Sequence, residues 1–420
     1  MHEPHDTPAG DHGKGRDLNP DLIRDFSLAN PPAGFIDHPA PFWAALRRHS
    51  PVHRLDERNV YLTAYADVLA VYRSAAVSSD KQQAFAPVFG ADAPLYAHHT
   101  TSLVFNDPPR HTRVRRILMG ALNQRAIARM EAGVVSLVDD LLDALPGRGA
   151  PDLIEHFAAQ IPVEVIGNLL AIPRADRGPL RGWSLAILSA LEPAPSAAVQ
   201  AAGNAAVTEF LGCLSTLLAE RRARPGDPEV DVLTRLMLGD ADGTLDETEL
   251  MHNCIFLLNA GHETTTNLIG NGAVLLMTHR DQLARLLAEP ALVNPAVEEL
   301  LRLESPIQIN NRLTTDAVPL PSGTTLPAGT FVHLAIGAAN RDPAVCADPD
   351  RMDIARSPNH HLAFGQGAHA CSGMNVARME GRIALGRLFQ RFPQLNLAGE
   401  PVRDRRLRFR GYARLPVQLG

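Results

Sequence analysis

The chemistry suggested by this chain centres on one cysteine. Residues 364–373 read Phe-Gly-Gln-Gly-Ala-His-Ala-Cys-Ser-Gly, so that Cys371 follows two glycines and a histidine. Glycine at positions 365 and 367 permits a tight turn and a close approach to a flat ligand, because no Cβ intervenes. A following helix would favour the thiolate over the thiol at its N-terminus. The stretch predicts a metal-thiolate site, and a buried inert thiol is the alternative.

The same spacing, Phe-Gly-x-Gly-x-His-x-Cys-x-Gly, resembles the haem-binding loop of the cytochrome P-450 superfamily. The resemblance implies that Cys371 is the proximal ligand of a haem iron and that His369 helps to hold a haem propionate. It also places further loop residues against the haem, namely Phe364, Gly365, Gly367 and Gly373. Further motifs in the family's order extend the resemblance over most of the chain, from about residue 41 to residue 419.

A second motif interrupts the longest apolar stretch, 255–277, which we interpret as a buried core helix. Residues 260–265 read Ala-Gly-His-Glu-Thr-Thr, and such polar groups are costly to bury. A local kink, with Thr264 bonding back to a carbonyl one turn earlier, would explain the motif structurally. The resemblance implies instead that it covers the distal face of the haem. There Thr264 would stabilise bound dioxygen, Glu263 would supply protons, and Ala260 and Gly261 would lie against the haem.

A buried haem needs cations with hydrogen-bond donors near its two propionates. His111 and Arg115 are four residues apart and share one face of the helix expected after a Pro-Pro pair. The residues that the resemblance assigns to the propionates are His111, Arg115, Arg312 and His369. Solvated surface charge is the alternative, and it is strongest for Arg115, which has arginine neighbours.

Glu299 and Arg302 are three residues apart and can pair on one helical face. Alone, this spacing is a weak signal. The resemblance adds Arg351 as a third charged member and implies a buried triad behind the cysteine loop. We expect the triad to be structural and not catalytic.

Composition indicates an ordinary globular protein. The 420 residues are 45% hydrophobic and 20% charged, and the net charge of -6 argues against nucleic acid as the main partner. Cysteines 213, 254, 346 and 371 form no Cys-x-x-Cys pair, so we expect no disulfides. The first 17 residues are polar and lack a signal-peptide core. We therefore expect a cytoplasmic protein without a membrane span.

The hydrophobic periodicity predicts a mainly α protein with a small β-rich lobe, which the resemblance identifies with the cytochrome P-450 fold. We expect a flexible arm over residues 1–20 and a single haem-thiolate monooxygenase domain over 21–420. Residues 51–64, 318–334 and 407–419 carry strand or hairpin patterns. Residues 82–103 are expected to form a long loop and 226–243 a polar connector. Asp246 with Glu249, and Asn294 with Pro295, are candidate helix starts.

The resemblance implies a haem b enzyme that inserts one atom of O2 into a small hydrophobic molecule. Electrons would come from NAD(P)H through an iron-sulfur ferredoxin and its reductase, docked near Arg113, Arg116, Arg125 and Arg378. We expect a monomer. A peroxide-driven peroxygenase, a haem-based sensor and a cysteine hydrolase are the alternatives.

Family analogy also proposes residues that would contact the substrate. They are Phe85, Leu257, Ile307, Ile309 and Tyr412. Because most of them are apolar, a terpenoid, aromatic or polyketide-like compound fits, but no residue selects among these classes.

Overall fold

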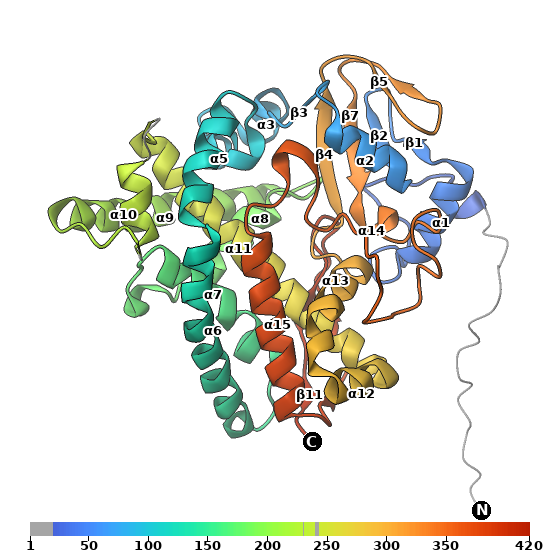
Figure 1. Cartoon of the computed structure of the whole chain (residues 1–420). Helices are drawn as coiled ribbons and strands as arrows, with labels where there is room; N and C mark the ends of the chain where they lie inside the picture. Colours follow the sequence, from blue (N-terminus) through green and yellow to red (C-terminus); the bar gives the residue numbers. More distant parts are fainter. Residues whose placement is uncertain (1–19, 230, 240–242) are drawn as a thin grey trace, which may run out of the picture.

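The computed structural model describes residues 20–229, 231–239 and 243–420, and the expected arm lies outside them apart from Pro20. The helices are α1 Ala40–His49, α2 Tyr65–Arg73, α3 Gln82–Phe89, α4 Pro94–Thr101, α5 Arg110–Ala121, α6 Gln124–Ala144, α7 Gln160–Leu169, α8 Leu180–Ser189, α9 Ala197–Ala223, α10 Val232–Leu238, α11 Glu247–Thr278, α12 Arg280–Ala288, α13 Val293–Leu303, α14 Ile336–Ala339 and α15 Met374–Arg391. The strands are β1 Val52–Arg54, β2 Asn59–Leu62, β3 Val77–Ser78, β4 Ile309–Thr314, β5 Val318–Pro319, β6 Thr325–Leu326, β7 Phe331–Ala335, β8 Asn396–Leu397, β9 Val402–Arg403, β10 Tyr412–Arg414 and β11 Val417–Gln418. Helices dominate, and the largest sheet lies at one side of the molecule (Figure 1). The predicted fold class is confirmed.

The longest helix, α11, begins at the predicted cap and crosses the helical part behind α15 (Figure 1). The Asp246 carboxylate accepts a hydrogen bond from the Glu249 N–H at 2.8 Å, and the Glu249 carboxylate accepts one from the Asp246 N–H at 3.3 Å. This capping box fixes where the helix starts. Because α7, α8, α13 and α15 all contact α11, the motif at 260–265 lies in the interior of the protein.

A large apolar core fixes α15, the helix that follows the cysteine loop. Val138 of α6, Leu300 of α13 and Leu385 of α15 are each at most 1% exposed and belong to this core. Burying such side chains stabilises the fold by roughly 1.5–3 kcal/mol each. The position of the loop is therefore set by helices distant in sequence.

The largest sheet positions the predicted propionate residue Arg312. Its strand order is β1-β2-β7-β4-β3, and the β2–β7 pair is parallel while the other pairs are antiparallel. In β4, side chains alternate between the two faces of the sheet. Asn310 and Arg312 therefore share one face, and Ile309 lies on the other.

Three local predictions are wrong. The expected loop at 82–103 contains α3 and α4, and the expected connector at 226–243 contains α10. These helices are short, and α4 buries Leu95 together with the four consecutive residues 98–101, which point to all sides, so it lacks the one-sided pattern that signals a helix. The helix expected to be capped by Asn294 begins at Val293, two residues before Pro295, so that Asn294 lies in its first turn.

Among the described helices, α9 alone has the length and apolar composition that a membrane span requires. It packs against α8 and also contacts α4 and α11. Core helices often have the same composition, so this finding is weak evidence for a span.

Candidate haem site

Cys371 lies in a loop whose shape depends on both predicted glycines. Gly365 and Gly367 have φ angles of 63° and 74°, in the left-handed region that glycine tolerates best. A Cβ on Gly367 would lie 2.3 Å from the carbonyl oxygen of Tyr72, so the close approach required here is to the α2 backbone. The Cys371 N–H donates to the Phe364 carbonyl at 2.8 Å and closes the loop.

The Cys371 side chain opens onto a cavity of about 250 Å³ between this loop and α11. Burial raises the pKa of the thiol, and the Gly373 N–H, Arg115 and Arg378 oppose that shift only in part. The predicted effect of the helix N-terminus therefore does not dominate. A bound cation would be needed to make the thiolate the stable form.

Predicted propionate residues lie together at one edge of this cavity. The rings of His111 and His369 are 4.0 Å apart, and Arg115 donates to the Ala370 carbonyl at 2.7 Å. Neither nitrogen of His111 has a hydrogen-bond partner among the described residues, although the residue is only 3% exposed. Burial, followed by the charges of Arg312, His111 and Arg115, lowers the pKa of His369 to about 3.

Arg312 projects from β4 as the sheet register requires. It is 5% exposed, and its guanidinium lies 5.4 Å from the centre of the Tyr72 ring. A half-buried thiol facing an apolar cavity, with buried basic groups and unused hydrogen-bonding atoms nearby, fits a haem with two carboxylates.

The motif at residues 260–265 of α11 faces the cavity on one side and the packed interior on the other. Ala260, Gly261 and Thr264 line the cavity, and the Thr264 hydroxyl donates to the Ala260 carbonyl at 2.6 Å. This is the back-bond that the structural explanation predicted. A Cβ on Gly261 would lie 2.8 Å from Ile166, so the glycine also permits α7 to pack closely.

Glu263 is directed away from the cavity lining. Its carboxylate is 3% exposed, pairs with Arg406 and accepts a hydrogen bond from the Asn267 amide at 3.0 Å. Arg406 also pairs with Asp404. Sequence reasoning missed Arg406, because it lies more than a hundred residues away and no local pattern links it to Glu263.

Sequence reasoning also missed Glu380 in α15. This fully buried carboxyl lines the cavity, accepts a hydrogen bond from the Thr265 hydroxyl at 3.2 Å, and has no charged partner among the described residues. Burial raises its pKa to about 8. The sequence did carry a signal for it, because an acidic residue stands among the buried positions of an otherwise apolar helix face.

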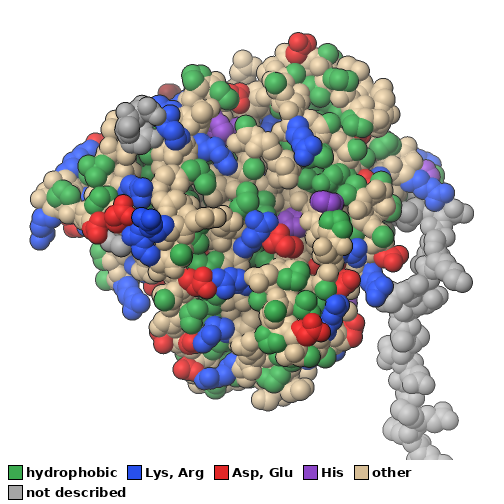
Figure 2. Space-filling view, in the orientation of Figure 1, with side chains coloured by type: hydrophobic (Ala, Val, Ile, Leu, Met, Phe, Trp, Pro, Cys, Tyr) green, Lys and Arg blue, Asp and Glu red, His purple; other side chains and the backbone are tan. Residues whose placement is uncertain are grey.

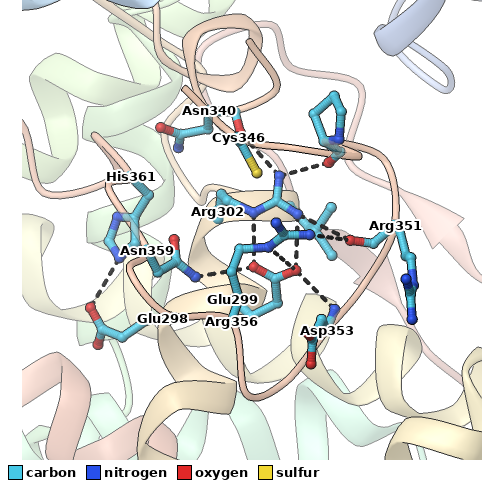
Figure 3. Close-up of polar contacts among 12 residues, drawn as sticks. Glu298, Glu299, Arg302, Asn340, Cys346, Arg351, Asp353, Arg356, Asn359 and His361 are labelled. Atoms are coloured by element: carbon cyan, nitrogen blue, oxygen red, sulfur yellow. Dashed lines mark hydrogen bonds and ion pairs between the residues drawn. The ribbon is translucent and has the colours of Figure 1, made fainter. Parts of the chain in front are cut away.

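The predicted charged triad exists with a different third member. Glu299, which is 0% exposed, accepts hydrogen bonds from Arg302 at 2.8 and 2.9 Å and from Arg356 at 3.2 Å. Figure 3 shows both guanidinium groups directed at this carboxylate and the Arg351 side chain directed away. Arg351 contributes its backbone carbonyl, which accepts from Arg302 and Arg356. The prediction of Arg351 is therefore corrected to Arg356.

Two of the five proposed substrate residues line the cavity, Leu257 and Ile307. The other three do not line it. Phe85 packs in an aromatic group with Phe89, His99 and Phe105. Ile309 faces the core beside α1, and Tyr412 stacks against Arg403 with the ring centre 4.1 Å from the guanidinium carbon.

Fold and site together define a haem-thiolate protein. The sequence model described as Cytochrome P450 matches residues 198–406. Vitamin D(3) 25-hydroxylase of Pseudonocardia autotrophica is 40% identical over 92% of this chain and 95% of its own length. Cytochrome P450 monooxygenase PikC of Streptomyces venezuelae is 37% identical over 91% and 92% of the two chains. The chain belongs to the cytochrome P450 family.

Solved structures agree with this assignment. P450BioI, crystallised with an acyl carrier protein bearing hexadec-9Z-enoic acid, matches with a TM-score of 0.87 and 32% identity over 92% of this chain and all of that one. CalO2 matches with a TM-score of 0.85 and 32% identity over 92% and 97%. The chain is thus a P450 monooxygenase that uses haem and O2 to oxidise a hydrophobic organic substrate. The cysteine hydrolase alternative is removed.

Proposed function

We propose that Cys371 binds the iron of haem b and that His111, Arg115, Arg312 and His369 hold the propionates. The observation that carries this assignment is the half-buried Cys371 sulfur facing a cavity that Arg115 and His369 also line, with the His111 ring 4.0 Å from the His369 ring. Bound haem would supply the oxygen chemistry. The apolar residues of the cavity would exclude water and hold the substrate, while the loop glycines keep the sulfur in place.

We propose that Thr264 and Glu263 take part in proton delivery from opposite sides of α11. The Thr264 hydroxyl faces the cavity and can exchange its bond to the Ala260 carbonyl for one to a ligand. The Glu263 carboxylate lies outside the cavity lining, held by Arg406 and Asn267. It can exchange protons with the cavity only when the Arg406 pair opens, so Arg406 acts as a positioning residue.

Replacing Thr264 with alanine is expected to uncouple oxygen consumption from oxidation. The fraction of electrons recovered in product should fall roughly tenfold or more, because a positioned proton donor is lost. Product and hydrogen peroxide formed per NAD(P)H consumed would be measured together. Thr264→Ser, which keeps the hydroxyl, should remain coupled, and full coupling in Thr264→Ala would contradict the assignment.

An iron-sulfur ferredoxin, served by an NAD(P)H-dependent reductase, is the proposed electron donor. Of the four arginines expected to dock it, Arg113 is paired with Glu249 and Arg378 with Glu298. Figure 2 shows basic and acidic side chains interspersed on the face that it presents. A weak, salt-sensitive encounter fits this pattern better than a strongly charged one.

Charge reversal at exposed Arg125 is expected to slow electron transfer several-fold at low salt and to flatten its salt dependence. Stopped-flow reduction by a ferredoxin would measure both effects. Arg58→Glu, an exposed change on the turn before β2, serves as the control. Equal rates and salt slopes for the Arg125 variant and the control would remove the proposed docking site.

We also propose that residues 21–420 form one domain and that the protein is a cytoplasmic monomer. The high coverage of both chains in the comparison with the Pseudonocardia autotrophica hydroxylase supports the single domain. Analytical ultracentrifugation of the holoprotein would test the monomer, and a concentration-dependent mass would contradict it.

A further inference from the structure

Lysine is almost absent from this chain. The sequence contains two lysines, Lys14 and Lys81, among its 40 lysine and arginine residues, and Lys81 is the one in the described part. It is 2% exposed, and its Nζ has no hydrogen-bond partner among the described residues. Burying an unpaired ammonium is costly. Since every other described cation of this type is an arginine, a lysine at this buried position calls for an explanation.

Lys81 lies between β3 and α3 and faces aromatic and basic side chains. Its Nζ is 5.1 Å from the centre of the Phe331 ring, which packs against the His333 ring at 5.1 Å. Burial, and then the charges of Arg312 and Arg408, lower the pKa of Lys81 to about 7, against the smaller opposing effect of Asp107 and Asp80. The side chain is therefore poised between its charged and neutral forms.

The two carboxylates near Lys81 bind other donors. Asp107 accepts hydrogen bonds from the Ser78 hydroxyl at 2.5 Å and the Ser79 N–H at 2.8 Å. Asp80 accepts one from the Gln82 N–H at 2.7 Å. The ammonium thus lacks a carboxylate partner within the described residues.

Three further basic side chains surround the same region and, with Lys81, form what we call the basic cluster: Lys81, His99, His333 and Arg408. His99 Nε2 and His333 Nδ1 are buried without hydrogen-bond partners in the described part of the chain. Arg408 donates to the carbonyls of Leu191 and Ile309 at 2.9 and 3.2 Å. Burial and then Arg408 lower the pKa of both histidines, each to about 3. The basic cluster therefore holds several unused polar atoms. The Glu192 carboxylate lies near Arg408, and it accepts hydrogen bonds from the Leu407 and Arg408 N–H groups at 2.8 and 3.2 Å.

The basic cluster lies behind the wall of the haem-site cavity. Ile307, which lines the cavity, forms a β-bridge with Phe409, and the Gln308 N–H donates to the Arg408 carbonyl at 2.8 Å. On the other side, the His99 ring packs against Phe105 at 5.6 Å, directly after two cavity-lining residues, Leu103 and Val104. None of the four side chains of the basic cluster lines the cavity, so a ligand would reach them only where these two wall segments part.

We propose that the basic cluster binds the carboxylate of an amphipathic organic acid whose apolar body occupies the cavity above Cys371. The inference rests on the proposed monooxygenase function and names its substrate class. An anion here would pair with the Lys81 ammonium and satisfy the open nitrogens of the cluster. A haem propionate is also a carboxylate. The test must therefore distinguish binding of the substrate carboxylate from binding of a haem propionate.

The test compares dodecanoate with dodecan-1-ol, which have alkyl chains of the same length and differ in charge. Binding to the ferric holoprotein would be followed by the spin-state shift of the haem, after its thiolate ligation has been verified with carbon monoxide. We expect dodecanoate to bind at least tenfold more tightly. Lys81→Met should reduce this ratio to about one, with dodecan-1-ol affinity changed less than threefold, while Lys81→Arg should keep part of the preference. Arg54→Met removes one exposed charge and should leave the ratio unchanged.

A wild-type ratio near one, or an unchanged ratio in Lys81→Met, would overturn the proposal. The rate of haem transfer to apomyoglobin shows whether Lys81 binds a haem propionate or the substrate carboxylate. Faster haem loss from Lys81→Met, with the acid preference intact, would make Lys81 a propionate partner. A missing thiolate signature in the wild type would refute the monooxygenase assignment itself, so the two failures are distinguishable.

A second measurement needs no variant. With 13Cε-labelled lysine, the holoprotein should show two lysine signals, since the chain has two lysines. In the ferrous carbon monoxide complex, dodecanoate should raise the pKa read from the buried lysine, because a bound anion favours the charged form. Dodecan-1-ol should not raise it. An equal response to both compounds would contradict the proposal.

Discussion

Replacing Cys371 with serine is expected to lower monooxygenase turnover more than about a thousandfold. The sulfur faces the cavity, and a serine oxygen would bind iron weakly and donate little electron density to it. The change replaces one atom, and the loop bond from the residue 371 N–H to the Phe364 carbonyl would remain. The loss should therefore come from ligation and not from unfolding.

Product formation under reductant-driven turnover would measure this effect, with haem content determined in parallel. Cys213→Ser, at a half-buried position in α9, is the matched control and should retain activity. Turnover within tenfold of the wild type in Cys371→Ser would show that another group binds the iron.

Removing the carboxylate at position 299 is expected to cost about 3–5 kcal/mol of unfolding free energy, because the buried Arg302 guanidinium and the half-buried Arg356 guanidinium lose their anion. Glu299 also accepts hydrogen bonds from the Asp353 N–H and the Asn359 amide, both at 3.0 Å. Denaturant unfolding of Glu299→Gln, followed by circular dichroism, would give the change.

Substitutions of Arg356 and Arg351 are the control for this prediction. Arg356→Ala should destabilise the protein clearly, since its guanidinium pairs with Glu299. Arg351→Ala should change stability by no more than about 0.5 kcal/mol, because its side chain is exposed and its carbonyl remains. A larger loss in Arg351→Ala than in Arg356→Ala would restore the original assignment.

The cysteine loop could be predicted because its chemistry is local. Ten consecutive residues contain the glycines, the histidine and the sulfur, and the loop closes on itself through Cys371 and Phe364. The triad was harder to predict. Arg351 and Arg356 both follow α13 in an irregular segment, and only the path of the backbone decides which side chain reaches Glu299.

The alternation of side chains along a β-strand could have corrected one of the proposed substrate residues, Ile309. Once Arg312 is assigned to the haem face of β4, strand alternation places Asn310 on that face and Ile309 on the other. Arg406 and Lys81 could not be placed in this way. Their positions depend on contacts between segments distant in sequence, which no local pattern in a single sequence encodes.

The ligation of Cys371 is tested most directly by the absorption spectrum of the reduced, carbon-monoxide-treated wild-type protein. The central claim predicts the strongly red-shifted Soret band of a thiolate-bound haem. A Soret band at the position typical of histidine-ligated haem proteins, or a purified protein that binds no haem, would contradict it.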